Sequence, residues 1–436
     1  MAQGVRKGFF YSSIGQIVSA VFVFLFQIVL GRKLPSAEFG MLNILYSLVL
    51  SFAVILNAGP RDVLIRNVSF YLAQNRKGHA GYVIKLSYIF YIIFSLIFIL
   101  VFAILSKWTT FRFFDGHYLY LLIFIIGTIV FAGFRITLSL SEAHREFHFF
   151  ALINILFSFF LFLGMIVYLI IPEGFGLNGL MWTIGLSPLL PALICAIIGK
   201  NRGWFPASER FEIKGIYFLF VSLSIINFLD MFLFRSGSIV IKLYGKEAGN
   251  TIAGLFNYVF VPVSAIRTLM IALFASIFPN ISNSLGAGDF RQAKHYIKRG
   301  IQFVSIVSIS LTLFFYLTGP ILMKLLYKKT TGPGRMDFLL VSLFVSFLLL
   351  GRLGNRILIA IGKAKYTLVA LFTGLAIIFL MPGLFKNSLL RGVEISLTTG
   401  TLIYSLIELI FILIFIRNLP STRKEEPNNK QQIPED

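Results

Sequence analysis

Residues 31–85 of the chain read GRKLPSAEFGMLNILYSLVLSFAVILNAGPRDVLIRNVSFYLAQNRKGHAGYVIK. The segment contains a short polar turn, a long apolar run that predicts a helix, and a basic loop. Gly59 and Pro60 end the apolar run, and we expect the helix to break there because proline removes a backbone hydrogen bond. Arg61 and Asp62 come directly after the predicted break.

A weaker copy of this segment occurs about half a chain later. Moving residues 63–85 along by 213 positions places them without a gap on residues 276–298, and matches Asn67 with Asn280 and Ser69 with Ser282. With one residue of slack, residues 40–43 (GMLN) fall on residues 254–257 (GLFN). We therefore expect the two halves of the chain to be copies of one unit.

Composition places the chain in a lipid bilayer. Of its 436 residues 57% are hydrophobic and 13% are charged, and the mean hydropathy is +0.86, which is far from the values of soluble domains. Twelve apolar runs reach roughly the 20 residues that cross the hydrocarbon core as a helix, so we predict an all-α membrane protein. These runs are residues 8–30, 41–59 (continuing to 73), 82–105, 118–141, 149–171, 176–199, 214–243, 251–283, 298–318, 336–361, 365–385 and 394–416.

The remaining segments complete the predicted organisation. Residues 1–205 form an N-terminal lobe with the first six spans, residues 206–418 form a C-terminal lobe, and the polar residues 419–436 form a disordered tail. Residues 319–327 are too short to span and predict an amphipathic interfacial piece. With the N-terminus inside, the inner loops carry 20 Lys and Arg against 11 outside, which predicts that both termini are cytoplasmic.

Eight cations fall inside the predicted spans. A cation at bilayer depth costs about 2.5–3.5 kcal/mol on insertion scales, so it normally faces a wet cavity, a partner charge or a substrate. The acids predicted at similar depth are Asp62, Asp230 and Glu408, which leaves positive charge in surplus. A cavity with surplus arginine attracts anions, and the planar guanidinium suits phosphate. The eight cations are Arg61, Arg66, Arg135, Arg235, Lys242, Arg267, Arg352 and Arg356.

The repeat also predicts where these cations lie. Aligning the fourth and tenth spans places Arg135 between Arg352 and Arg356, which share a helix face. We expect these three residues and Arg61 to line a vestibule open to the cytoplasm. Arg267 is then nearer the middle of the membrane and Arg235 further out.

Structural interpretations apply to several of these groups. Arg66 and Lys242 lie close enough to helix ends to extend to the interface, and we expect that of both. Asp62 and Arg66 are four residues apart and are as consistent with a structural pair as with separate roles. Asp230 and Glu408 are candidates for coupling H⁺ or Na⁺, but neutralising an arginine on another helix is the simpler expectation for each.

Enzymatic and nucleic-acid functions find no support in the sequence. The five histidines all fall in predicted loops, and no nucleotide-binding loop, nucleophile elbow or metal-ligand pattern is present, so we expect neither an enzyme nor a cofactor. The basic residues are distributed over short loops, as the positive-inside pattern requires, and we expect them to meet anionic lipids and not nucleic acid.

Several motifs resemble the polysaccharide transporter branch of the multidrug/oligosaccharidyl-lipid/polysaccharide (MOP) superfamily, the Wzx-type O-antigen flippases. They are GRKLPSAEFGMLN at 31–43, VLIRNVSFYLAQNRK at 63–77, LYGKEAGNTIAGLFN at 243–257 after Asp230, PNIS at 279–282, GDFRQAKHY at 288–296 and IAIGKAKY at 359–366. The resemblance covers nearly the whole chain. Gly59-Pro60 departs from the Gly-Leu that is usual in the family at this position.

This resemblance implies two six-helix lobes related by a pseudo-two-fold axis along the membrane normal, and alternating access by rocking of the lobes. It implies that the chain moves a polyprenyl-diphosphate-linked oligosaccharide from the inner to the outer leaflet of a prokaryotic cell membrane, with other polysaccharide-assembly proteins as candidate partners. Arg61, Arg135, Arg352 and Arg356 would capture the diphosphate, and Arg267 and Arg235 would accept it. A multidrug exporter of the same superfamily and a polytopic membrane enzyme are the alternatives.

Overall fold

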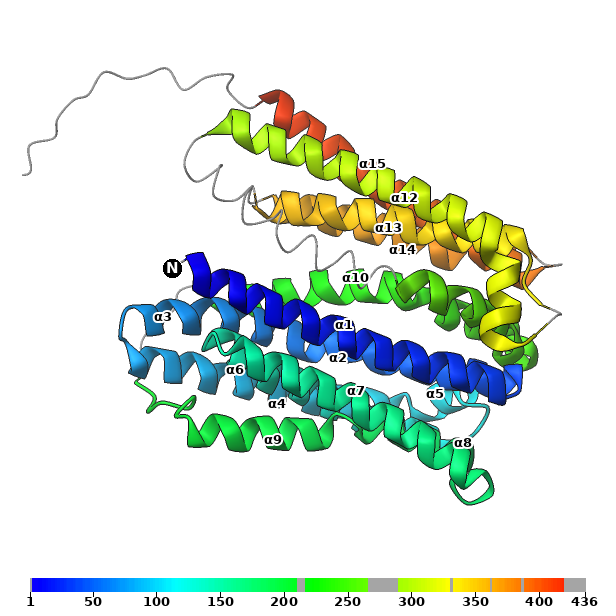
Figure 1. Ribbon diagram of the computed structural model, residues 1–436, viewed down its shortest axis with the longest axis horizontal. Helices are drawn as coiled ribbons and strands as arrows, with labels where there is room; N and C mark the ends of the chain where they lie inside the picture. Colours follow the sequence, from blue (N-terminus) through cyan, green and yellow to red (C-terminus); the bar gives the residue numbers. More distant parts are fainter. Residues whose placement is uncertain are drawn as a thin grey trace, which may run out of the picture.

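The computed structural model describes residues 2–209, 216–265, 289–329, 332–360, 363–385 and 388–418, and within these ranges every regular element is a helix (Figure 1). The predicted all-α fold is confirmed. The first half contains α1 (Ala2–Lys33), α2 (Ser36–Val63), the π-helix η1 (Leu64–Val68), α3 (Ser69–Ala73), α4 (Lys77–Ile104), α5 (Ser106–Phe113), α6 (Tyr118–Ala143), α7 (Phe147–Ile170), α8 (Pro172–Leu186) and α9 (Leu189–Asn201). The second half contains α10 (Ile216–Gly245), the 3-10 helix η2 (Lys246–Ala248), helical residues 249–265, α12 (Phe290–Tyr327), α13 (Arg335–Ala360), α14 (Ala364–Leu380), η3 (Met381–Leu384) and α15 (Leu389–Asn418).

Eleven helical stretches of the described chain are long and apolar enough to cross a membrane, which makes this a multi-pass integral membrane protein. The longest stretch, Phe220–Ala265, contains two predicted spans, because η2 interrupts it at Lys246, whose φ of 46° is left-handed. The two arms are antiparallel neighbours, since Asn257 Nδ2 donates to Ser238 Oγ at 2.9 Å and the ring of Phe256 lies against Gly237. Counting these arms separately gives the twelve predicted spans.

Two predicted boundaries are wrong. The helix does not break at Gly59-Pro60, because α2 continues through Pro60 to Val63 and is extended by η1 and α3. The glycine instead allows close packing, since a Cβ at Gly59 would lie 2.1 Å from the carbonyl oxygen of Phe220 in α10. Residues 319–327 are not a separate interfacial piece, because α12 runs without interruption through Pro320 to Tyr327.

The helices before Asn201 and those after Ile216 pack mainly among themselves, and α2 packing along α10 joins the two sets. We call the end of the bundle where the N-terminus lies the near end, and the opposite end, with Lys33 and α5, the far end (Figure 1). Figure 1 shows α12 approaching α1 at the far end and diverging from it towards the near end. At the far end Arg32 Nη2 donates to Leu325 O at 2.7 Å. The lobe boundary at 205/206 stays a prediction, and residues 419–436 lie outside the described ranges.

The GMLN and GLFN repeats meet each other at the far end. A Cβ on Gly40 would lie 1.8 Å from the carbonyl oxygen of Asn250, and a Cβ on Gly254 would lie 2.0 Å from that of Ser36. Each glycine therefore faces the residue four positions before its counterpart. Asn43 and Asn257 also make the same bond, each donating from Nδ2 to the carbonyl four residues earlier. This reciprocity is what a pseudo-two-fold axis between the two halves requires.

Candidate functional site

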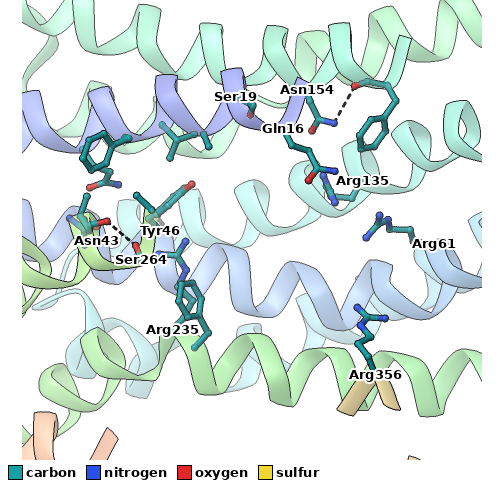
Figure 2. A pocket seen from close by; sticks show the side chains of 18 residues that line it. Gln16, Ser19, Asn43, Tyr46, Arg61, Arg135, Asn154, Arg235, Ser264 and Arg356 are labelled. Carbon is teal, nitrogen blue, oxygen red and sulfur yellow. Dashed lines mark hydrogen bonds between the residues drawn. The ribbon is translucent and has the colours of Figure 1, made fainter. Parts of the chain in front are cut away.

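A cavity of about 460 Å³ lies between the two halves, and four of the six arginines predicted to bind substrate line it: Arg61, Arg135, Arg235 and Arg356 (Figure 2). The other lining residues are uncharged. They are Gln16, Ser19, Ala20, Val23, Phe24, Gln27, Asn43, Tyr46, Phe150, Asn154, Phe234, Val261, Ser264 and Ala265.

Helix direction places the arginines at different depths. Arg61, Arg135 and Arg356 lie in the near-end halves of α2, α6 and α13, whereas Arg235 lies in the far-end half of α10. Figure 2 shows the first three gathered on one side of the cavity and Arg235 on the other, beside Tyr46, Asn43 and Ser264. Gln16 and Gln27 mark the length of the cavity along α1, about 16 Å at helical rise. We call the region with Arg61, Arg135 and Arg356 the arginine end of the cavity, and the region with Arg235 the closed end.

The arginine end carries unbalanced positive charge. Arg61 Nη2 lies 3.3 Å from Glu142 Oε2 of α6, and the side chains are 30% and 14% exposed. Within the described part of the chain, no carboxylate lies within 4 Å of the Arg135 or Arg356 guanidinium, and none lines the cavity. Guanidinium groups without carboxylate partners at membrane depth are suited to binding an anion.

Arg235 is held among aromatic rings. Its guanidinium carbon lies 5.2 Å from the centroid of the Tyr46 ring, 5.0 Å from that of Phe234 and 5.8 Å from that of Phe260. Such cation–π contacts stabilise a cation that has left water. Its Nε is nevertheless buried and has no hydrogen-bond partner in the described structure.

The position of Arg352 differs from the predicted one. It does not line the cavity but forms a two-point ion pair with Asp230 of α10, with Nε 2.8 Å from Oδ1 and Nη2 2.5 Å from Oδ2. Asp230 thus neutralises an arginine on another helix, the simpler of its two predicted roles. Arg267 lies outside the described residues.

Two structural interpretations need correction. Lys242 does not extend to the interface, because it is 1% exposed and its Nζ lies 2.6 Å from Asp115 Oδ1. Asp62 does not pair with Arg66 but accepts a hydrogen bond from Asn227 Nδ2 at 3.2 Å. Arg66 is exposed and sits in η1, where π-helical winding displaces residues four apart from a common face.

Glu408 is the remaining predicted acid and pairs with no arginine. It is 0% exposed, lies against Gly354, and neither carboxyl oxygen has a hydrogen-bond partner in the described structure. Among the described residues, no group of three or more His, Cys, Asp or Glu side chains could hold a metal ion.

Sequence reasoning missed two features of this site. Glu142 follows the predicted fourth span, so the sequence does not place it among the acids at bilayer depth, but Arg61 and Glu142 both lie at the near-end termini of their helices. The uncharged polar side chains were also missed. Gln16, Gln27 and Asn154 interrupt apolar runs, and that interruption was the available signal.

No family model matches the chain and no curated protein does so. Solved structures do. An inward-facing MATE family multidrug resistance transporter of the MOP superfamily superposes with a TM-score of 0.70 at 14% identity, covering 92% of this chain and 95% of that one. The outward-facing conformation of such a transporter gives 0.67 at 14%, covering 95% and 96%. A MOP superfamily transporter from Pyrococcus furiosus, described as having a binding pocket of reverse polarity that suggests a different function, gives 0.68 at 15%, covering 95% and 97%. At these identities the likeness establishes the fold alone, which is that of the MATE and MOP transporters and confirms the predicted fold class.

Proposed function

We propose, on the premise of this transporter fold, that the chain is a flippase that moves a polyprenyl-diphosphate-linked oligosaccharide from the inner to the outer leaflet of a prokaryotic cell membrane. The observation that carries the proposal is the lining of the cavity, with four arginines and no carboxylate among the described residues. A diphosphate needs such a set of donors, and its polyprenyl tail can stay in lipid while the polar head occupies the cavity.

The proposed cycle follows the depth of the arginines. Arg61, Arg135 and Arg356 bind the diphosphate while the lobes are apart at the near end, which we take as cytoplasmic together with both termini. Rocking of the lobes then closes the near end and opens the far end. Arg352 of α13 contributes to the cycle indirectly, through the ion pair with Asp230 that joins α13 to α10. After release of the cargo, the lobes must return to the state that is open at the near end. Candidates for driving this return are the membrane potential, or H⁺ or Na⁺ acting through Asp230 or Glu408.

A multidrug exporter is the alternative that the fold equally allows. An exporter of organic cations needs carboxylates in its cavity, and the described lining contains none. The cationic lining therefore favours an anionic cargo over a cationic one. A polytopic membrane enzyme has less support, because no histidine is among the described residues that line the cavity.

Reconstituted protein tests the proposal. We expect proteoliposomes with the wild-type protein to translocate a fluorescent polyprenyl-diphosphate sugar. The translocation rate of the double variant Arg135→Gln/Arg356→Gln should be at least about tenfold lower than that of the wild type. Arg66→Gln is the matched control, because Arg66 is exposed and does not line the cavity. Equal rates in the double variant and the control would contradict an anion-binding role. Transport of an organic cation instead of the lipid-linked sugar would favour the exporter.

A further inference from the structure

Two buried polar atoms at the closed end of the cavity lack a hydrogen-bond partner in the described structure. One is the amide oxygen Oε1 of Gln27, a residue only 3% exposed, and the other is Nε of Arg235. Both side chains line the cavity. A buried polar group without a partner costs about 1–3 kcal/mol, and nearly all such groups in folded proteins are satisfied. A ligand that reaches this end of the cavity and bonds to both atoms would remove that cost.

The neighbouring polar groups share one chemical property. Asn43 uses its Nδ2 to donate to Phe39 O at 2.9 Å, and Ser264 uses its hydroxyl to donate to Val261 O at 3.0 Å. The Ser264 hydroxyl hydrogen and one of the two Asn43 N–H groups are therefore occupied within their own helices, and the amide and hydroxyl oxygens remain as acceptors. Together with Gln27 Oε1 they form a set of uncharged acceptors.

A wall that carries these acceptors beside the Arg235 donors selects a ligand that both donates and accepts hydrogen bonds. Phosphate and carboxylate oxygens are acceptors only, so they can accept from Arg235 but leave Gln27 Oε1 without a donor. Hydroxyl groups donate and accept, so a hydroxyl can donate to Gln27 while a neighbouring oxygen accepts from Arg235. The rings of Phe24, Tyr46 and Phe234 add apolar faces beside these groups.

We propose that the closed end, lined by Gln27, Asn43, Ser264 and Arg235, is a sugar subsite that binds the hydroxyl groups of a glycan whose phosphates occupy the arginine end. This inference rests on the proposed function and adds to it which part of the cargo binds at each end of the cavity. Tyr46 and Arg61 are fifteen residues apart on α2, about 22 Å of helix, so one elongated head group can contact both ends.

Binding to the full-length protein in nanodiscs tests the subsite with two probes, a polyprenyl diphosphate and the same lipid carrying a linked disaccharide. We expect the wild type to bind the sugar-bearing probe at least about tenfold more tightly, and Gln27→Leu to abolish most of that difference without changing the affinity for the bare diphosphate. Gln74→Leu is the matched control, because Gln74 is exposed at the end of α3 and outside the cavity.

Thermal unfolding separates this role from a structural one. Because Gln27→Leu replaces a buried amide whose oxygen has no hydrogen-bond partner in the described structure with an apolar side chain, its Tm should equal or exceed that of the wild type. Equal wild-type affinity for both probes, or a Gln27→Leu variant that weakens both equally, would overturn the sugar subsite while leaving anion binding in place. Failure of Arg135→Gln/Arg356→Gln to weaken either probe would instead overturn the proposed function.

Discussion

Arg352 and Asp230 hold each other in a two-point ion pair between α13 and α10, with their side chains 11% and 17% exposed. Removing one partner of a buried pair leaves an uncompensated charge, which costs about 3–5 kcal/mol. We therefore expect Asp230→Asn and Arg352→Gln each to lower the Tm of the purified protein by several degrees. Arg352→Met combined with Asp230→Leu should recover much of that loss, because the double change removes both charges.

Arg356 provides the contrast on the same helix. It is exposed to the cavity and has no carboxylate within 4 Å in the described structure, so Arg356→Gln should weaken binding of a polyprenyl diphosphate with little change in Tm. Thermal unfolding and ligand binding measured on both variants check this division. A stable Arg352→Gln variant with weakened binding would show that Arg352 contacts cargo directly.

Helix count, the repeat and the cationic cavity could be predicted from the sequence because each depends on local composition or spacing. Membrane spans are apolar over about 20 residues regardless of their neighbours, and an arginine inside a span is visible in one sequence. Gly40 and Gly254 each pack against the other segment, and this reciprocal contact corresponds to the sequence repeat at positions 40–43 and 254–257.

The pairing of charges could not be predicted, because it depends on contacts between distant segments. Arg352 and Asp230 are 122 positions apart, and Arg61 reaches Glu142 across 81. Nothing local distinguishes paired Arg352 from unpaired Arg356. Gly59-Pro60 has the composition of a break, but α10 packs so closely against Gly59 that the helix is retained.

One histidine of the near-end loops, His144, has a pKa lowered by its surroundings. The His144 ring stacks on Trp204 with centroids 5.7 Å apart, and its Nε2 lies 3.2 Å from Trp204 O. Burial lowers the pKa of His144, while the contact with Trp204 O and the charge of Glu146 oppose that shift. The folded chain thus binds this proton less tightly than the unfolded chain. Its contribution to stability is complete above the ordinary histidine pKa of about 6.5 and is lost as the pH falls below it.

Thermal unfolding between pH 8 and pH 5.5 checks this expectation. Tm should fall towards the acid end in the wild type and fall less in His144→Gln, whose side chain does not titrate. The exposed His148 is the matched control, and His148→Gln should keep the wild-type slope. Identical slopes in all three proteins would rule out a contribution from His144.

An ion pair and a hydrogen bond join the two halves of the chain at the far end. Lys242 of α10 lies 2.6 Å from Asp115, and Asn250 Nδ2 donates to the other oxygen of Asp115 at 2.7 Å. Because Lys242 is buried, Asp115→Asn leaves its charge unpaired and should favour separation of the lobes there. A cysteine at Ser36, whose hydroxyl lies 3.3 Å from Tyr258 Oη, reports this separation through faster maleimide labelling in a Cys195→Ser background. The exchange Asp115→Lys/Lys242→Asp should restore slow labelling, and unchanged labelling in Asp115→Asn would contradict the closure.

The paired glycines at the far end predict a coupled effect of two substitutions. A Cβ at Gly40 or Gly254 would lie 1.8 Å or 2.0 Å from a backbone oxygen of the other segment, so Gly40→Ala and Gly254→Ala should each force the helices apart at a cost of about 1–3 kcal/mol. Once the first substitution has separated them, the second meets more space, and the double variant should therefore lose less stability than the sum of the two. Gly383→Ala is the control, because its Cβ would lie 3.6 Å from the Tyr244 ring and fit without strain. Additive losses of stability would mean that the two glycines do not share one contact.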